Sequence, residues 1–129
     1  MVKTIPLRTL AVYLFEDAPS MACLRKRFGE QVSVTAKNMA SLADYVAWEG
    51  CASVLLDHAG WEQFVTARDK AVLEYIDSIT GIDADDDWKT QARLEKEAIH
   101  KRNVKCAKAF AEIYNRMKEV RNNELANHA

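Results

Sequence analysis

The chain has 129 residues, a formal net charge of −1 and a hydrophobic fraction of 49%. This length fits one domain with its own core, and the composition excludes a wholly disordered chain. A net charge near zero excludes a global electrostatic attraction to nucleic acid. Charge is nevertheless uneven, because acidic residues are in excess over residues 61–87 and basic residues over 88–129.

Cysteine usage and hydropathy bear on localisation. Cys23, Cys51 and Cys106 have no close spacing, the chain has no signal peptide, and no apolar run approaches the ~20 residues of a membrane span. We therefore expect a cytoplasmic, reduced protein outside the membrane. Each cysteine falls on an apolar position, which predicts three buried thiols.

The first third of the chain predicts two helices. Leucines and alanines at helical spacing follow Pro6 and predict a helix ending near Glu16, although the same residues also fit a strand. A second helix should begin after Asp17 or Ser20 and stop at Gly29. Residues 30–34 predict a very short strand or a turn.

The middle of the chain predicts two or three more helices. Ser33 or Thr35 can cap a helix that closes near Gly50. A short apolar helix over Cys51–Ala59 follows and stops at Gly60, or continues the preceding one. The next helix begins at residue 61 or 62 and ends at Thr80 and Gly81, with one apolar stripe formed by Phe64, Ala71, Val72, Tyr75, Ile76 and Ile79.

The longest predicted helix runs from Trp88 to Arg121, without glycine or proline and with aspartates at its start as caps. At ~1.5 Å per residue it would be ~50 Å long, which exceeds the diameter expected for a compact domain of this size. It must kink near residues 100–103 or project toward a partner. Its apolar seam is Ile99, Cys106, Phe110, Ile113, Met117 and Val120.

These elements predict an all-α fold, a bundle of five or six helices in a single domain over residues 1–129. Residues 1–81 should form a compact helical part, with a helix-turn-helix at residues 20–48, and residues 85–122 the long C-terminal helix. The seam could pack internally, in a homodimer or on a target protein. The pattern does not choose among these three.

One segment suggests DNA binding. A short helix, a glycine-containing turn and a second capped helix over Leu24–Leu42 resemble the broad helix-turn-helix class. Polar side chains on such helices can reach phosphates and base edges. The residues that would do so here are Arg25, Lys26, Arg27, Thr35, Lys37 and Asn38.

Three patterns suggest catalysis or metal binding, and none is complete. Arg93 and His100 have a spacing that resembles helical HEPN-type ribonucleases, but Leu94 replaces the polar residue that commonly follows the arginine. Glu97 and His100 form an E-x-x-H pair, whereas di-iron bundles need a second copy. The acidic run from Asp83 to Asp87 lacks the glycine and glutamate of a calcium loop. We therefore expect no metal, no cofactor and no enzymatic activity.

The remaining hypothesis is a small regulator, adaptor or inhibitor that acts by stoichiometric binding of another protein, with a homodimer as the expected state. Small domains without a site signature are typical of phage and mobile-element accessory proteins. Exposure of a tryptophan beside the seam would favour protein binding over core closure. The predicted protein-binding residues are Ile99, Phe110, Ile113, Met117 and Val120 on the seam, with Lys101 and Lys105 for an acidic partner surface.

Overall fold

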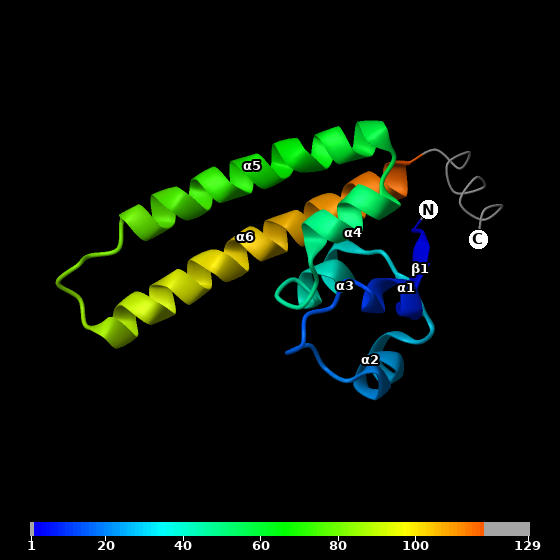
Figure 1. Cartoon of the computed structure of the whole chain (residues 1–129), viewed down its shortest axis with the longest axis horizontal. Helices are drawn as coiled ribbons and strands as arrows, with labels where there is room; N and C mark the ends of the chain where they lie inside the picture. The colour runs from blue at the N-terminus through cyan, green and yellow to red at the C-terminus, as the bar shows by residue number, and fades with distance from the viewer. Residues whose placement is uncertain (1, 118–129) are drawn as a thin grey trace.

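The computed structural model describes residues 2–117, and these form six helices and one two-stranded sheet (Figure 1). The helical prediction is confirmed, and the sheet is an addition to it. In chain order the elements are β1 (Thr4–Pro6), α1 (Leu7–Ala11), α2 (Met21–Phe28), β2 (Gln31–Ser33), α3 (Ala36–Ser41), α4 (Trp48–Leu55), α5 (His58–Thr80) and α6 (Trp88–Arg116).

Helices α5 and α6 form a long antiparallel hairpin, which one view shows extending past the rest of the protein (Figure 1). Both starts are capped by aspartates: Asp57 accepts a hydrogen bond from the Gly60 amide, and Asp87 accepts one from the Thr90 amide, each at 2.7 Å. Helix α6 runs unbroken to Arg116, so the kink predicted near residues 100–103 is absent. The hairpin projects instead.

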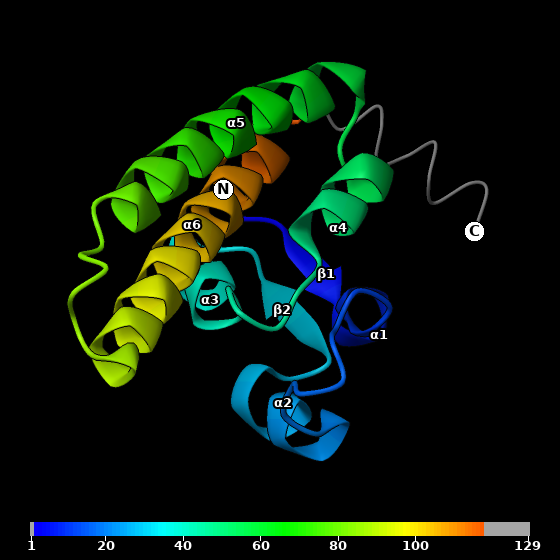
Figure 2. The same ribbon diagram turned by 60° about the vertical axis from the view of Figure 1, so that its left-hand side comes forward.

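Residues 2–46, which we call the N-terminal module, surround the small sheet (Figure 2). Ile5 pairs with Val32 in the antiparallel register of β1 and β2, so the strand predicted as one option at residues 30–34 is confirmed. The helix predicted from Pro6 to Glu16 is wrong in extent, because β1 takes up Pro6 and α1 ends at Ala11.

Two predicted boundaries in the middle of the chain are also wrong. Helix α3 ends at Ser41, and Gly50 lies inside α4 rather than at a helix end. One long-range and one local hydrogen bond hold the intervening chain out of a helix. The Ala47 amide donates to the distant Tyr13 carbonyl at 2.8 Å, and the Trp48 indole donates to the Ala43 carbonyl, five residues earlier, at 3.0 Å. Gly60 lies in the first turn of α5 instead of stopping a helix.

The core lies where the module and α4 pack against one end of the hairpin (Figures 1 and 2). Phe110 of α6 and Phe64 of α5 are fully buried there, and the Trp48 ring lies 5.6 Å from that of Phe110. No helix within residues 2–117 is both long and apolar enough to cross a membrane.

Candidate protein-binding surface

One apolar stripe runs the length of α6 and is covered over only half of it. Because 3.6 residues make one helical turn, spacings of four and seven residues keep Trp88, Ala92, Ile99, Cys106 and Phe110 on one side. The side chains change from 73% exposed at Trp88 and 37% at Ile99 to 7% at Cys106 and 0% at Phe110. We call Trp88, Ala92 and Ile99 the open half, and Cys106, Phe110, Ile113 and Met117 the covered half.

The covered half of the predicted seam packs within the protein itself. Phe110, Ile113 and Met117 are buried in the protein's own core, where no partner can reach them in this structure. They therefore drop out of the predicted interface, because the N-terminal module and α4 already occupy their side of the helix. Val120 lies outside the described residues. Of the predicted seam residues, Ile99 alone remains exposed among those described.

The open half belongs to a thin part of the molecule. We call the segment Val72–Lys105 the arm. Ala98 is the single buried residue in it. Two helices packed only on each other bury few side chains, and helices usually gain their stability by burying an apolar face against tertiary neighbours. The arm therefore has apolar surface without a third layer over it.

The N-terminal module meets the arm at Asp44, a residue that sequence reasoning missed. Its carboxylate lies 2.7 Å from His100 Nδ1 and accepts a hydrogen bond of 3.1 Å from the Asn103 amide. Asp44 follows α3 and is 56 residues from His100 in sequence, so no local pattern relates them. This contact ties the N-terminal module to the start of the arm.

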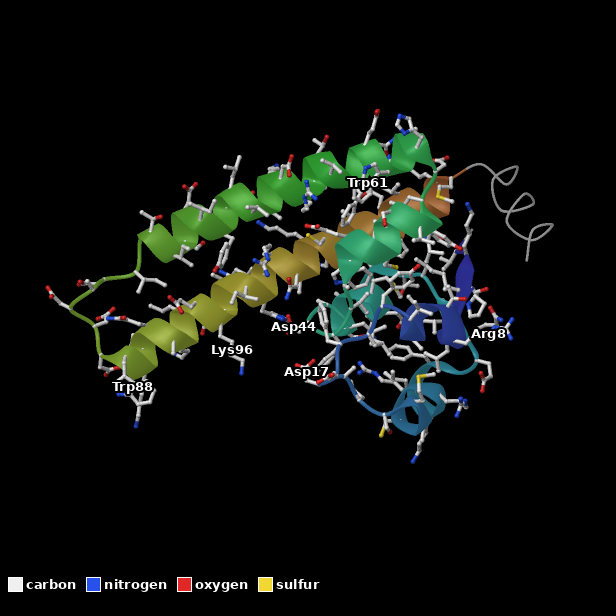
Figure 3. All side chains as sticks on the ribbon, viewed as in Figure 1. Arg8, Asp17, Asp44, Trp61, Trp88 and Lys96 are labelled. Carbon is white, nitrogen blue, oxygen red and sulfur yellow. The ribbon has the colours of Figure 1, made fainter. Side chains whose placement is uncertain are left out.

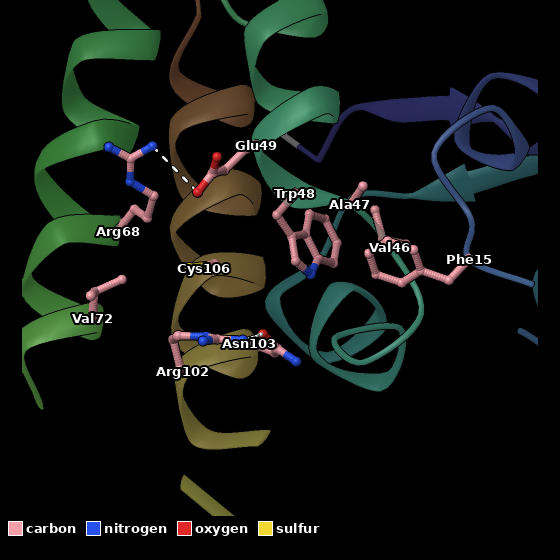
Figure 4. A pocket seen from close by; sticks show the side chains of 10 residues that line it. All are labelled: Phe15, Val46, Ala47, Trp48, Glu49, Arg68, Val72, Arg102, Asn103 and Cys106. Atoms are coloured by element: carbon pink, nitrogen blue, oxygen red, sulfur yellow. Dashed lines mark hydrogen bonds and ion pairs between the residues drawn. The ribbon is translucent and has the colours of Figure 1, made fainter. Parts of the chain in front are cut away.

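Two cavities flank this junction. One of about 410 Å³ lies between α4 and the hairpin, where Glu49 and Arg68 approach to 3.4 Å (Figure 4). The other, of about 650 Å³, lies between the module and α6, and Ile99, Tyr45 and Asp17 line it. We call the second cavity the cleft. The open half of the stripe leads into it.

The basic side chains of α6 near the predicted partner residues Lys101 and Lys105 are largely engaged in internal contacts. Lys105 forms an ion pair with Glu74, Arg102 lies over the Tyr75 ring at 4.9 Å, and His100 contacts Asp44. Lys101 is exposed, and it lines the cleft together with Ile99. Of the two lysines predicted to meet an acidic partner, Lys105 is therefore engaged within the protein, whereas Lys101 remains exposed at the cleft.

Two other lysines border the open half. Lys96 follows Ala92 by four residues and Lys89 by seven, so both lie along one edge of it. Neither lysine forms an ion pair within residues 2–117; Lys89 lies 5.7 Å from the Trp88 ring. Lys96 and Trp88 point away from α6 on the side that faces the cleft (Figure 3).

The residues considered for catalysis and metal binding have structural contacts. Arg93 pairs with Glu97 at 2.9 Å, one turn away on the same helix, while His100 contacts Asp44. The Thr90 amide lowers the pKa of the capping Asp87 carboxyl by hydrogen bonding to its charged form. Within residues 2–117, no three His, Cys, Asp or Glu side chains gather closely enough to hold a metal ion.

The segment considered for DNA binding does not have helix-turn-helix geometry. Strand β2 lies between α2 and α3, because Val32 and Val34 are buried and β2 pairs with β1. Thr35 caps α3 by accepting a hydrogen bond from the Asn38 backbone amide, and the Asn38 side chain donates from Nδ2 to the Ser33 carbonyl at 2.9 Å. The other candidates are Arg25, paired with Glu30 at 2.5 Å, the exposed Lys26, and Arg27 and Lys37, which line a 370 Å³ surface hollow together with Asn38.

The three cysteines differ in environment. Burial raises the pKa of the Cys51 thiol to about 12 and also raises the pKa of Cys106. Cys23 is exposed, so the prediction that all three are buried is wrong for Cys23. It lies on the outer side of α2, where only Leu24 is buried.

Comparison with known proteins gives no match. No protein-family model fits the chain, and no curated protein or solved structure is significantly similar to it.

Proposed function

We propose that this protein is a non-catalytic regulator, adaptor or inhibitor that binds another protein stoichiometrically through the open half of α6. The observation that supports this proposal is the change in burial along one stripe of one helix. Phe110 is fully buried and Trp88 is 73% exposed, although both belong to the same apolar side. Aromatic anchors next to aliphatic residues often dominate protein interfaces.

The setting of the open half also supports protein binding. The stripe enters the cleft of about 650 Å³ at Ile99, so a docked segment would contact both the arm and the N-terminal module. A groove between two surfaces buries more of a docked helix than a flat face does.

We also propose that the protein resides in the reducing cytoplasm, where its three thiols stay free. The pKa values of the two buried cysteines, Cys51 and Cys106, are raised.

The proposal is tested by affinity capture from a lysate of the source cell, with nuclease treatment, using the wild-type protein and two variants. Ile99→Asp places a charge in the open half, and Val54→Asp is the matched control, since Val54 is an exposed apolar residue of α4. We expect a stoichiometric protein that survives nuclease, that Ile99→Asp loses and that Val54→Asp retains. The same captured set with all three proteins, or none, would contradict the proposal.

A further inference from the structure

We propose that the occupant of the open half is an amphipathic helix with acidic side chains along one edge of its apolar face. This inference rests on the proposed function and specifies the chemistry of the partner. The length of the surface fits a helix, because Trp88 and Ile99 are eleven residues apart and thus about 16 Å apart along the α6 axis. Three turns of a partner helix span that distance.

The apolar part of the surface matches helix packing. Trp88 and Ile99 stand at the two ends of the open half, and the small residue Ala92 lies between them. A small residue between two larger ones leaves a depression into which a side chain of a second helix can insert. The partner should therefore present a large apolar residue opposite Ala92.

Charge selects an acidic partner. Lys89 and Lys96 lie along one edge, and neither forms an ion pair in the described part of the chain. An acidic residue every seven positions on the partner would meet both lysines. The opposite edge carries Glu95 and Arg102, the latter held over Tyr75. Glu95 disfavours acidic residues there, so the acidic side chains of the partner should be confined to the lysine edge.

A second copy of this chain fits the same surface less well. The N-terminal module blocks a parallel pairing of two arms, because it stands on the cleft side of α6 (Figure 1). In an antiparallel symmetric pair each surface meets itself. The lysine edge would then face another lysine edge, and Glu95 would face Glu95. Like charges in such positions oppose association.

The test uses the full chain and two synthetic helical peptides with the same apolar stripe, one flanked by glutamates and one by lysines. Binding is followed by NMR chemical-shift changes at the Trp88 indole and the Ile99 amide. For the wild-type protein we expect about tenfold tighter binding of the glutamate peptide in low salt, and a smaller difference in high salt. The preference should reverse in the double variant Lys89→Glu with Lys96→Glu.

The control is the double variant Lys70→Glu with Lys108→Glu, which makes the same charge change on exposed residues of the hairpin that lie outside both the stripe and the cleft. It should keep the preference of the wild type. Equal binding of the two peptides, no binding, or shifts located away from Trp88 and Ile99 would overturn the inference.

The outcomes separate this inference from the proposed function. If Ile99→Asp loses its captured protein but the peptides show no charge preference, protein binding stands and the acidic helix is wrong. If sedimentation shows a dimer of the wild type that Ile99→Asp dissociates, the occupant is a second copy, which also overturns the inference. If no variant changes capture and neither peptide binds, both proposals are wrong.

Discussion

The two halves of α6 have the same apolar periodicity but different surroundings. From Cys106 to Met117 the stripe is buried by the N-terminal module, α4 and α5, whereas from Trp88 to Ile99 it is exposed. Only the presence of a third layer distinguishes them. An apolar pattern on a helix therefore identifies a face that can be buried, and the rest of the fold decides whether that face stabilises the monomer or remains for a partner.

The largest expected contrast comes from truncating one residue in each half. Phe110→Ala should lower the free energy of unfolding by about 3–5 kcal/mol, because it leaves a cavity beside Trp48. Ile99→Ala should lower it by less than about 1 kcal/mol, since Ile99 is already partly in water. Urea denaturation of both variants measures the difference. Similar losses would mean that the arm is as well packed as the core around Phe110.

Alkaline pH should destabilise the folded protein through Cys51, which is buried in the core. The folded-state pKa of about 12 lies above the ordinary value of 9.0, so the folded protein holds a proton that the unfolded chain releases. Stability is retained below pH 9 and falls between pH 9 and 12, by up to about 1.4 kcal/mol for each pH unit. Tyr13 and Tyr114 also have pKa values raised by burial and contribute to the same loss.

The variant Cys51→Ala isolates the thiol from the two tyrosines. Its unfolding free energy should fall less steeply between pH 9 and 12 than that of the wild type, as followed by chemical denaturation at several pH values. Identical slopes would show that the Cys51 thiol is not protected from ionisation by the fold.

Two glycines outside the arm, Gly50 and Gly60, allow a comparison of loose and tight packing. A Cβ at Gly60 would lie 2.9 Å from the capping oxygen of Asp57 and 3.0 Å from Ile113 Cγ2, so Gly60→Ala should cost about 1–3 kcal/mol. Gly50→Ala is the control, because its nearest neighbour lies at 3.5 Å and the helix should gain about 0.5–1 kcal/mol. Thermal unfolding of the two variants should shift in opposite directions. A stabilised Gly60→Ala would contradict the close packing of α5 on α6.

The smallest expected effect is at the boundary between the halves. Asp44→Ala removes the contacts to His100 and Asn103, both on the exposed surface, and should cost less than about 1 kcal/mol. The charge-neutral Asp44→Asn should cost no more. A loss of several kcal/mol, measured by urea denaturation, would mean that the arm depends on this contact for its own folding.

The predictable parts of this fold are those determined by local chemistry. Ser20 and Thr35 cap helices as their side chains allow, Gly29 ends α2 with a φ of 80°, and Asp87 starts α6. Gly60 was mispredicted as a helix stop because Asp57, three residues earlier, caps a helix that includes it. A glycine alone does not show whether it ends a helix or allows a neighbour to approach.

The candidate surface was only partly predictable, for a different reason. Periodicity identified Ile99 and Phe110 as members of one seam, but their difference in burial depends on Trp48, which is distant in sequence. Asp44 could not be related to His100 for the same reason. The basic surface predicted at Lys101 and Lys105 was overestimated, because Glu74 of the facing helix pairs with Lys105 and Tyr75 holds the neighbouring Arg102.

Amide hydrogen exchange along α6, with and without the glutamate-flanked peptide, tests the division of this helix most directly. In the free protein, amides from Cys106 to Ile113 should be protected close to the limit of global unfolding, and those from Ala92 to Ile99 should exchange much faster. The peptide should slow exchange in the second group and leave the first unchanged. Uniform protection along α6, or protection gained only outside Trp88–Ile99, would contradict this account.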